Sequence, residues 1–152
     1  IGSTLSTGTC SGGRTGRVVA TNCCISDSRG EAFYVFAGSS AVIRGCYISK
    51  CGQRGISVEG PKGTTVHVED TRISECGTGV HICNGRVKVS ANNVEIVKSS
   101  SLDFEVSYFV TGDVTVNNCR FRIAGAMLDH TVPDEICTIT VDGVNYQVRH
   151  QH

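Results

Sequence analysis

The feature that most constrains this chain is an internal repeat within residues 42–82. The two halves, VIRGCYISKCGQRGISV and VHVEDTRISECGTGVHI, match at an offset of 25 residues. This offset places Ile48 over Ile73 and Cys51 over Cys76. Short β-branched runs that are broken by glycines and recur at such a period are typical of stacked solenoids. We therefore expect a fold built from repeated units.

The repeat extends in both directions along the chain. One apolar position can be followed through five units, with spacings of 23, 25, 21 and 27 residues: Ile25, Ile48, Ile73, Val94 and Phe121. Each unit holds three short runs of alternating apolar and polar residues, and no segment shows a helical period. The pattern predicts an all-β fold, a right-handed parallel β-helix of about five coils of ~24 residues with three strands per coil.

Alternation along the strands predicts which side chains face the core. The five repeated anchors point inward, and the residue two positions before each anchor does the same: Cys23, Cys46, Thr71, Asn92 and Cys119. In the fourth coil the inward pair of the third run is Leu102 and Phe104. The residue three positions before each anchor is expected to form a tight bend: Asn22, Gly45, Asp70, Ala91 and Asn118.

The chain length of 152 residues corresponds to one domain, residues 1–152. Residues 1–16 are rich in Gly, Ser and Thr and form either a loop or the remnant of an upstream coil, while regular coils occupy 18–122. Residues 124–135 lack the repeat pattern and are expected to form a loop excursion. Residues 139–148 are two alternating runs around Asp-Gly, which predicts a terminal hairpin. Because the chain begins with Ile, we interpret it as processed or as a fragment of a longer protein.

The charge balance and the cysteines limit the functional class. Fourteen basic and fourteen acidic residues give a net charge of zero, which argues against nucleic-acid binding and polybasic membrane binding. No apolar run approaches the ~18 residues of a membrane span. The nine cysteines are odd in number, and three of them occupy one inward repeat position. We therefore favour reduced, buried thiols and a reducing compartment over a secreted disulfide framework.

Two groups of residues are candidates for a chemical site. Leu128-Asp129-His130 has a superficial likeness to a motif of pectate lyases, but it lies outside the repeat and lacks a basic partner. Stacking of outward positions brings four metal-ligating residue types near one spot: His81, Cys83, Asp103 and Glu105. No ligand spacing of a known zinc motif supports a metal there. We expect no catalytic site, no metal site and no cofactor.

Other outward positions favour contacts rather than chemistry. Stacking predicts a cation–π contact of Arg72 with Tyr47, in a column that continues through Asn93 and Arg120, and an ion pair of Arg44 with Glu69. Two adjacent aromatic residues, Tyr34 and Phe36, also point outward. Exposed aromatic residues in one patch are typical of an interface, so this pair is the candidate interaction surface.

The middle of the chain resembles a known family. The segments SAVIRGCYISKCGQRGISV and TRISECGTGVHICNGRVKVSANNVEI are similar to the Cys-rich β-helix of adenovirus proteins, namely the large early-region-1B protein and the capsid knob proteins of reptile-type adenoviruses. The likeness covers roughly residues 18–122 and is carried by Arg44, Gly45, Cys46, Ile48, Cys51, Gly55, Ile56, Ile73, Glu75, Cys76, Gly79, Val87 and Val89. This resemblance implies a trimeric β-helix, without catalytic activity, that clamps neighbouring subunits of a viral shell.

From these observations we predict a non-enzymatic structural and binding protein of a virus particle. It would act as a homotrimer that contacts capsid proteins at the virion surface, after assembly in the host nucleus or another reducing compartment. One alternative is a tailspike-type β-helix that binds or cleaves polysaccharides. Another is a cellular β-helix module for protein interactions.

Overall fold

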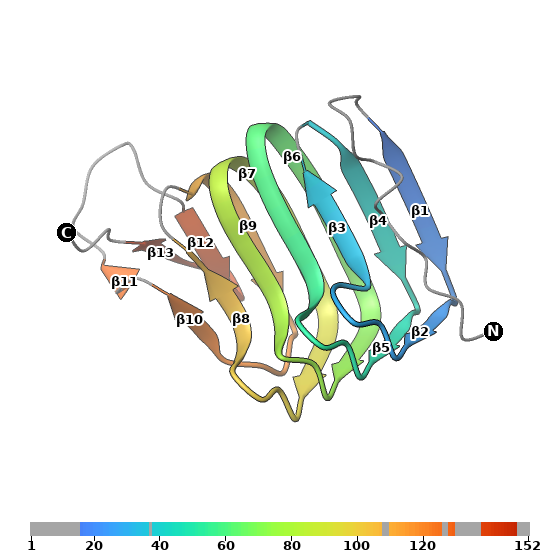
Figure 1. Ribbon diagram of the computed structural model, residues 1–152. Helices are drawn as coiled ribbons and strands as arrows, with labels where there is room; N and C mark the ends of the chain where they lie inside the picture. The colour runs from blue at the N-terminus through green and yellow to red at the C-terminus, as the bar shows by residue number, and fades with distance from the viewer. Residues whose placement is uncertain (1–15, 37, 108–109, 126–127, 130–137, 149–152) are drawn as a thin grey trace.

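The computed structural model describes residues 16–36, 38–107, 110–125, 128–129 and 138–148. These residues contain strands and no helix, and the strands stack into successive coils along one axis (Figure 1). The strands are β1 Arg17–Thr21, β2 Cys24–Ser26, β3 Phe33–Phe36, β4 Ser40–Arg44, β5 Tyr47–Ser49, β6 Arg54–Ser74, β7 Thr78–Val97, β8 Leu102–Val106, β9 Val110–Asn117, β10 Ile123–Gly125, β11 Leu128–Asp129, β12 Thr138–Val141 and β13 Val144–Val148.

Three parallel ladders run along the stack, and each forms one face of the solenoid. The first face pairs β1, β4, β6, β7, β9 and β12 in that order. The second face pairs β2, β5, β6 and β7, and the third pairs β3, β6, β7, β8 and β10. Strands β6 and β7 are long because each continues around the bends from one face to the next. The prediction of a parallel β-helix with three runs per coil is confirmed.

Inward side chains from all three faces form one apolar core. Ile25, Ile48 and Ile73 are fully buried and stack in register through β2, β5 and β6. Val94 is also buried, and Phe121 is partly buried against the same core. At ~25 cal/mol per Å² of apolar surface removed from water, this continuous core is the main source of stability.

The predicted register is wrong by two residues in the fourth coil. Ile73 pairs with Ile96, whereas Val94 pairs with Thr71, so the repeated anchor of this coil is Ile96. The same shift moves Asn92 to an exposed position beside Glu69. On the third face the inward pair becomes Phe104 and Val106 instead of Leu102 and Phe104. Within a strand a shift of two preserves the direction of each side chain, and for this reason the alternation pattern did not reveal it. Asn92 does change direction, because it lies on the other side of the bend at Asn93.

The bend between the first and second faces uses the left-handed backbone region in every coil. The residues with positive φ there are Asn22, Gly45, Asp70, Asn93 and Asn118, at φ of 54°, 60°, 49°, 54° and 50°. Asn93 takes the place predicted for Ala91, because asparagine tolerates this conformation much better than alanine does. The Asn93 amide also donates a hydrogen bond to Asp70 Oδ1 at 2.6 Å, which ties two successive bends together.

All the cysteines that the structure describes are free thiols: Cys23, Cys24, Cys46, Cys51, Cys76, Cys83 and Cys119. Cys46 is buried, and burial raises the pKa of its thiol. Cys23 and Cys119 are only partly buried, contrary to the expectation that all three would be enclosed. Cys23 belongs to the first described coil, and the coil of Cys119 is followed by the terminal hairpin, so each has fewer described neighbours along the stack than Cys46 has.

The last described residues form the expected hairpin. Strands β12 and β13 pair antiparallel around the turn Asp142-Gly143, and β12 continues the parallel ladder of β9. The hairpin therefore lies across one end of the stack (Figure 1). The segment 124–135 is not entirely outside the coils, because Ala124 and Gly125 belong to β10, which pairs with β8. Residues 126–127 and 130–135 lie outside the described residues.

Candidate functional site

The outer side of the third face carries the aromatic pair predicted from the sequence. Tyr34 and Phe36 both point outward and are half-buried, and their ring centroids lie 5.0 Å apart at an interplanar angle of 50°. The Tyr34 hydroxyl donates a hydrogen bond to Glu59 on the next coil. Burial, together with this carboxylate, raises the pKa of Tyr34 to about 12, so the phenol stays neutral. Tyr34 and Phe36 thus form an apolar patch in which the orientation of the Tyr34 ring is fixed by its hydrogen bond to the neighbouring coil.

Polar side chains continue from this patch along the same face. In register, Tyr34 is followed by Ser57, His81 and Glu105, while Phe36 is followed by Glu59 and Cys83. Asp103 was expected beside His81, but the shift by two residues puts Glu105 there instead. His81 Nε2 lies 3.5 Å from Glu105 Oε2. The structure thus brings His81, Cys83 and Glu105 to one region and leaves Asp103 outside it.

His81 is enclosed although it is on the outer side of the sheet. Its exposed fraction is 8%, and that of Ser57 is 1%. Burial, with a further contribution from the Arg54 guanidinium, lowers the pKa of His81, and this outweighs the opposing effect of Glu105. Among the described residues no group of three or more His, Cys, Asp or Glu side chains is arranged to hold a metal ion. The arrangement therefore favours a neutral imidazole within a polar column.

The lowered pKa of His81 predicts a pH dependence of stability. Unfolded His titrates near ~6.5, so between that value and the lower folded pKa the unfolded state binds more protons. The contribution of His81 to stability is then complete above about pH 6.5 and decreases as the pH falls below it. Urea unfolding between pH 7 and pH 5 should show a steeper loss for the wild type than for His81→Gln. Parallel losses in the two proteins would contradict this assignment.

The second face carries the predicted charged column with one change of member. Arg72 lies over Tyr47, with its guanidinium carbon 6.0 Å from the ring centroid. Beside this column, at the end of the first face, Arg44 Nε is 3.2 Å from Glu69 Oε2. Both predicted contacts are confirmed. The next member of the column is Glu95 rather than Asn93, and Glu95 Oε1 lies 3.6 Å from Arg72 Nε. The arginines of these ion pairs are about half exposed and the glutamates about one third exposed, so each pair contributes at most ~1 kcal/mol.

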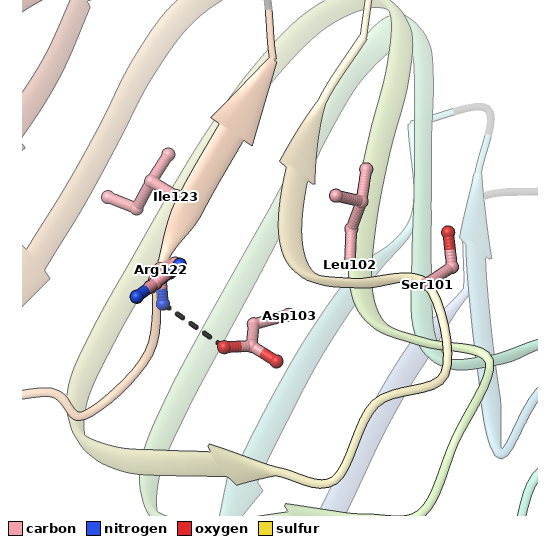
Figure 2. Close-up of a pocket in the computed structure, with 5 residues that line it drawn as sticks. All are labelled: Ser101, Leu102, Asp103, Arg122 and Ile123. Atoms are coloured by element: carbon pink, nitrogen blue, oxygen red, sulfur yellow. Dashed lines mark hydrogen bonds between the residues drawn. The ribbon is translucent and has the colours of Figure 1, made fainter.

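A groove of about 510 Å³ lies beside the third face, where β8 and β10 begin. Figure 2 shows the Asp103 carboxylate facing the backbone of Arg122, whose N–H donates a hydrogen bond to Asp103 Oδ2 at 3.2 Å. Ser101, Leu102 and Ile123 complete the lining. The groove combines one acid and one base with apolar walls.

Two buried thiols, those of Cys51 and Cys76, lie side by side in successive coils. The 25-residue repeat offset matches these two cysteines but predicts no function for them. Cys51 and Cys76 occupy equivalent positions in successive coils and are each 2% exposed. A hydrogen bond between the thiols lowers the pKa of Cys76 to about 7 and raises that of Cys51.

The Leu128-Asp129-His130 motif is only partly described. Leu128 and Asp129 form β11, which pairs antiparallel with β13, and His130 lies outside the described residues. Asp129 is therefore part of the terminal strand pairing and not of the regular coils.

Within the described part of the chain, no helix is long and apolar enough to cross a membrane.

Sequence reasoning missed one chain of polar contacts on the first face. His67 lies between Ser90 of the next coil and Glu69 of its own strand, with ring nitrogens 3.1 Å and 3.4 Å from the respective oxygens. The signal was present, because His67 and Ser90 are 23 residues apart, which is one repeat length.

One comparison with known proteins gives a match. The model of the family described as right handed beta helix region matches residues 3–130, which is most of the chain. No curated protein and no solved structure matches this sequence. The family match agrees with the parallel ladders and gives the hand of the coil.

Proposed function

Because the chain belongs to the right-handed β-helix family, we propose that it is a structural, binding component of a virus particle that acts as a homotrimer. The observation that carries this proposal is the patch of Tyr34 and Phe36 on the outer side of the third face. Their hydrogen bond and ring contact hold them in place before binding, which limits the entropy lost on association. Aromatic residues of this kind dominate the binding energy of protein interfaces.

The geometry of the solenoid supports a role in repeated contacts. Parallel ladders joined by backbone hydrogen bonds present a flat, stiff surface, and closed cyclic symmetry would display three copies of it. Several weak contacts to a repetitive shell gain from effective concentration rather than from one tight site. The likeness of residues 18–122 to the adenovirus β-helix proteins supports a viral shell as the partner. The free thiols of the described residues support assembly in a reducing compartment.

A second candidate function is favoured by the groove between Asp103 and Arg122. Grooves with a few polar groups and apolar walls suit the ring of a sugar, whose faces are apolar and whose edges carry hydroxyls. This supports a tailspike-type protein that binds or cleaves polysaccharides. Binding of a carbohydrate by the purified chain would distinguish this tailspike-type function from the structural role in a virus particle.

The oligomeric state tests the first proposal. Light scattering of the wild type should give three times the 16.1 kDa mass of one chain, and the double variant Tyr34→Ser/Phe36→Ser should reduce it to the monomer mass. Tyr47→Ser is the matched control, because it removes an exposed aromatic residue from another face and should leave the trimer intact.

Two results would count against the trimer proposal. The first is a wild-type monomer at tens of micromolar that the double substitution leaves unchanged. The second is degradation of an acidic polysaccharide by the same sample, which would favour the tailspike-type function.

A further inference from the structure

Three side chains on the outer side of the first face form a continuous chain of contacts. His67 on β6 pairs in register with Ser90 on β7, and both point outward because Val66, Val68, Val89 and Ala91 beside them are buried. His67 Nδ1 lies 3.1 Å from Ser90 Oγ, and His67 Nε2 lies 3.4 Å from Glu69 Oε2. The contacts thus run from the Ser90 hydroxyl to the His67 imidazole and from there to the Glu69 carboxylate.

The carboxylate determines which imidazole nitrogen carries the proton. An ionised Glu69 carboxylate can accept hydrogen bonds but cannot donate one, so the proton of neutral His67 resides on Nε2. The lone pair of Nδ1 then faces the Ser90 hydroxyl. Arg44 Nε lies 3.2 Å from the same Glu69 oxygen and holds this carboxylate in place. These are the relations of a serine nucleophile, its base and the group that orients the base.

The chain of contacts is accessible to solvent. His67 and Glu69 are 31% and 33% exposed, and Ser90 is half-buried, in contrast to the enclosed Ser57 and His81 on the third face. A substrate can therefore reach the Ser90 hydroxyl from outside the sheet.

Hydrogen-bond donors flank the serine on its own strand. Lys88 and Asn92 lie two residues before and after Ser90, point to the same side of the sheet and are exposed. The ammonium of Lys88 and the side-chain amide of Asn92 are both donors. Such groups can stabilise negative charge that develops on an oxygen next to the nucleophile.

We propose that Ser90 is a catalytic nucleophile for carboxylic esters, with His67 as general base and Glu69 as the residue that positions it. Ser90 Oγ forms a bond to the acyl carbon while its proton moves to His67 Nδ1. The bond from that carbon to the alcohol oxygen breaks, and His67 returns the proton to the leaving alcohol. Water, deprotonated by His67, then releases the acid and restores the serine.

The open position of Ser90 limits the class of ester. A nucleophile on the outer side of a sheet suits small acyl groups, such as acetyl, that approach from solvent or project from an extended chain. This inference does not depend on the trimer or on the viral partner, and it adds a reaction to the binding role proposed above.

A biotinylated fluorophosphonate probe tests the proposal on the full chain. Attack by Ser90 forms an oxygen–phosphorus bond and releases fluoride, and peptide mass spectrometry locates the modified serine. We expect labelling at Ser90 and its loss in Ser90→Ala. His67→Gln should slow labelling by about 10²-fold or more, the usual contribution of a general base. Ser100→Ala removes an exposed serine elsewhere on the coil and should leave the rate unchanged.

The role of Glu69 has a readout separate from the labelling rate. Nitrogen NMR of the wild-type imidazole should show the proton on Nε2 of His67, and Glu69→Gln should change this tautomer without unfolding the chain. No modification of Ser90 by the probe would overturn the proposal. Equal labelling of Ser90 in the wild type and in folded His67→Gln would also overturn it, because the histidine would then not act as a base.

Discussion

Replacing Ile73 with alanine will lower the free energy of unfolding by about 2–5 kcal/mol. Ile73 is fully buried and stacks between Ile48 and Ile96, so the substitution leaves a cavity bounded by two coils. Both neighbours are held by backbone hydrogen bonds of the ladders and cannot move in to fill the space. In urea unfolding, Ile73→Ala should have a lower midpoint than the wild type, while the slope of the unfolding free energy against urea concentration should be the same for both proteins.

The matched control for this prediction is Val19→Ala. Val19 is also a β-branched strand residue, but its side chain lies on the outer side of the first face and is 59% exposed. Its substitution should change the unfolding free energy by less than ~0.5 kcal/mol. Equal losses at the two positions would mean that Ile73 is not a core residue.

Two patterns in the sequence were sufficient to predict the architecture. The recurrence of the anchors indicated coils, and the alternation within each run indicated which side chains are buried. Neither pattern separates Val94 from Ile96 as the anchor, because both residues are β-branched, both point inward and both are buried. The bend residue does separate them, since Asn93 adopts positive φ readily and Ala91 does not.

The same register error decided which outward contacts could be predicted. Arg44 with Glu69, and Arg72 with Tyr47, join the second and third coils, where the alignment was correct. The partner of His81 lies on the fourth coil, so Asp103 was expected where Glu105 stands. The enclosure of Ser57 and His81 depends on how neighbouring side chains lie over the sheet, and an alternation pattern contains no information about this.

Replacing Gly112 with alanine will lower the free energy of unfolding by about 2–6 kcal/mol, the combined cost of backbone strain and steric overlap. Gly112 has φ of +103°, which side-chain-bearing residues rarely adopt. An added Cβ would also overlap the backbone carbonyl oxygen of Val87, with which Gly112 pairs in the ladder of β7 and β9. The bend before the first face of this coil therefore requires glycine.

Two other glycines separate the causes of this loss. Gly143 has φ of +83° and open space around it, so Gly143→Ala should show the cost of strain alone, about 1–3 kcal/mol. Gly30 has open space and no positive φ, so Gly30→Ala should be neutral or stabilise by up to ~1 kcal/mol. We expect the losses to rank Gly112 above Gly143 above Gly30 in urea unfolding. A loss at Gly112 no larger than that at Gly143 would show that the coils can separate locally, and close packing of β7 against β9 would then not limit this bend.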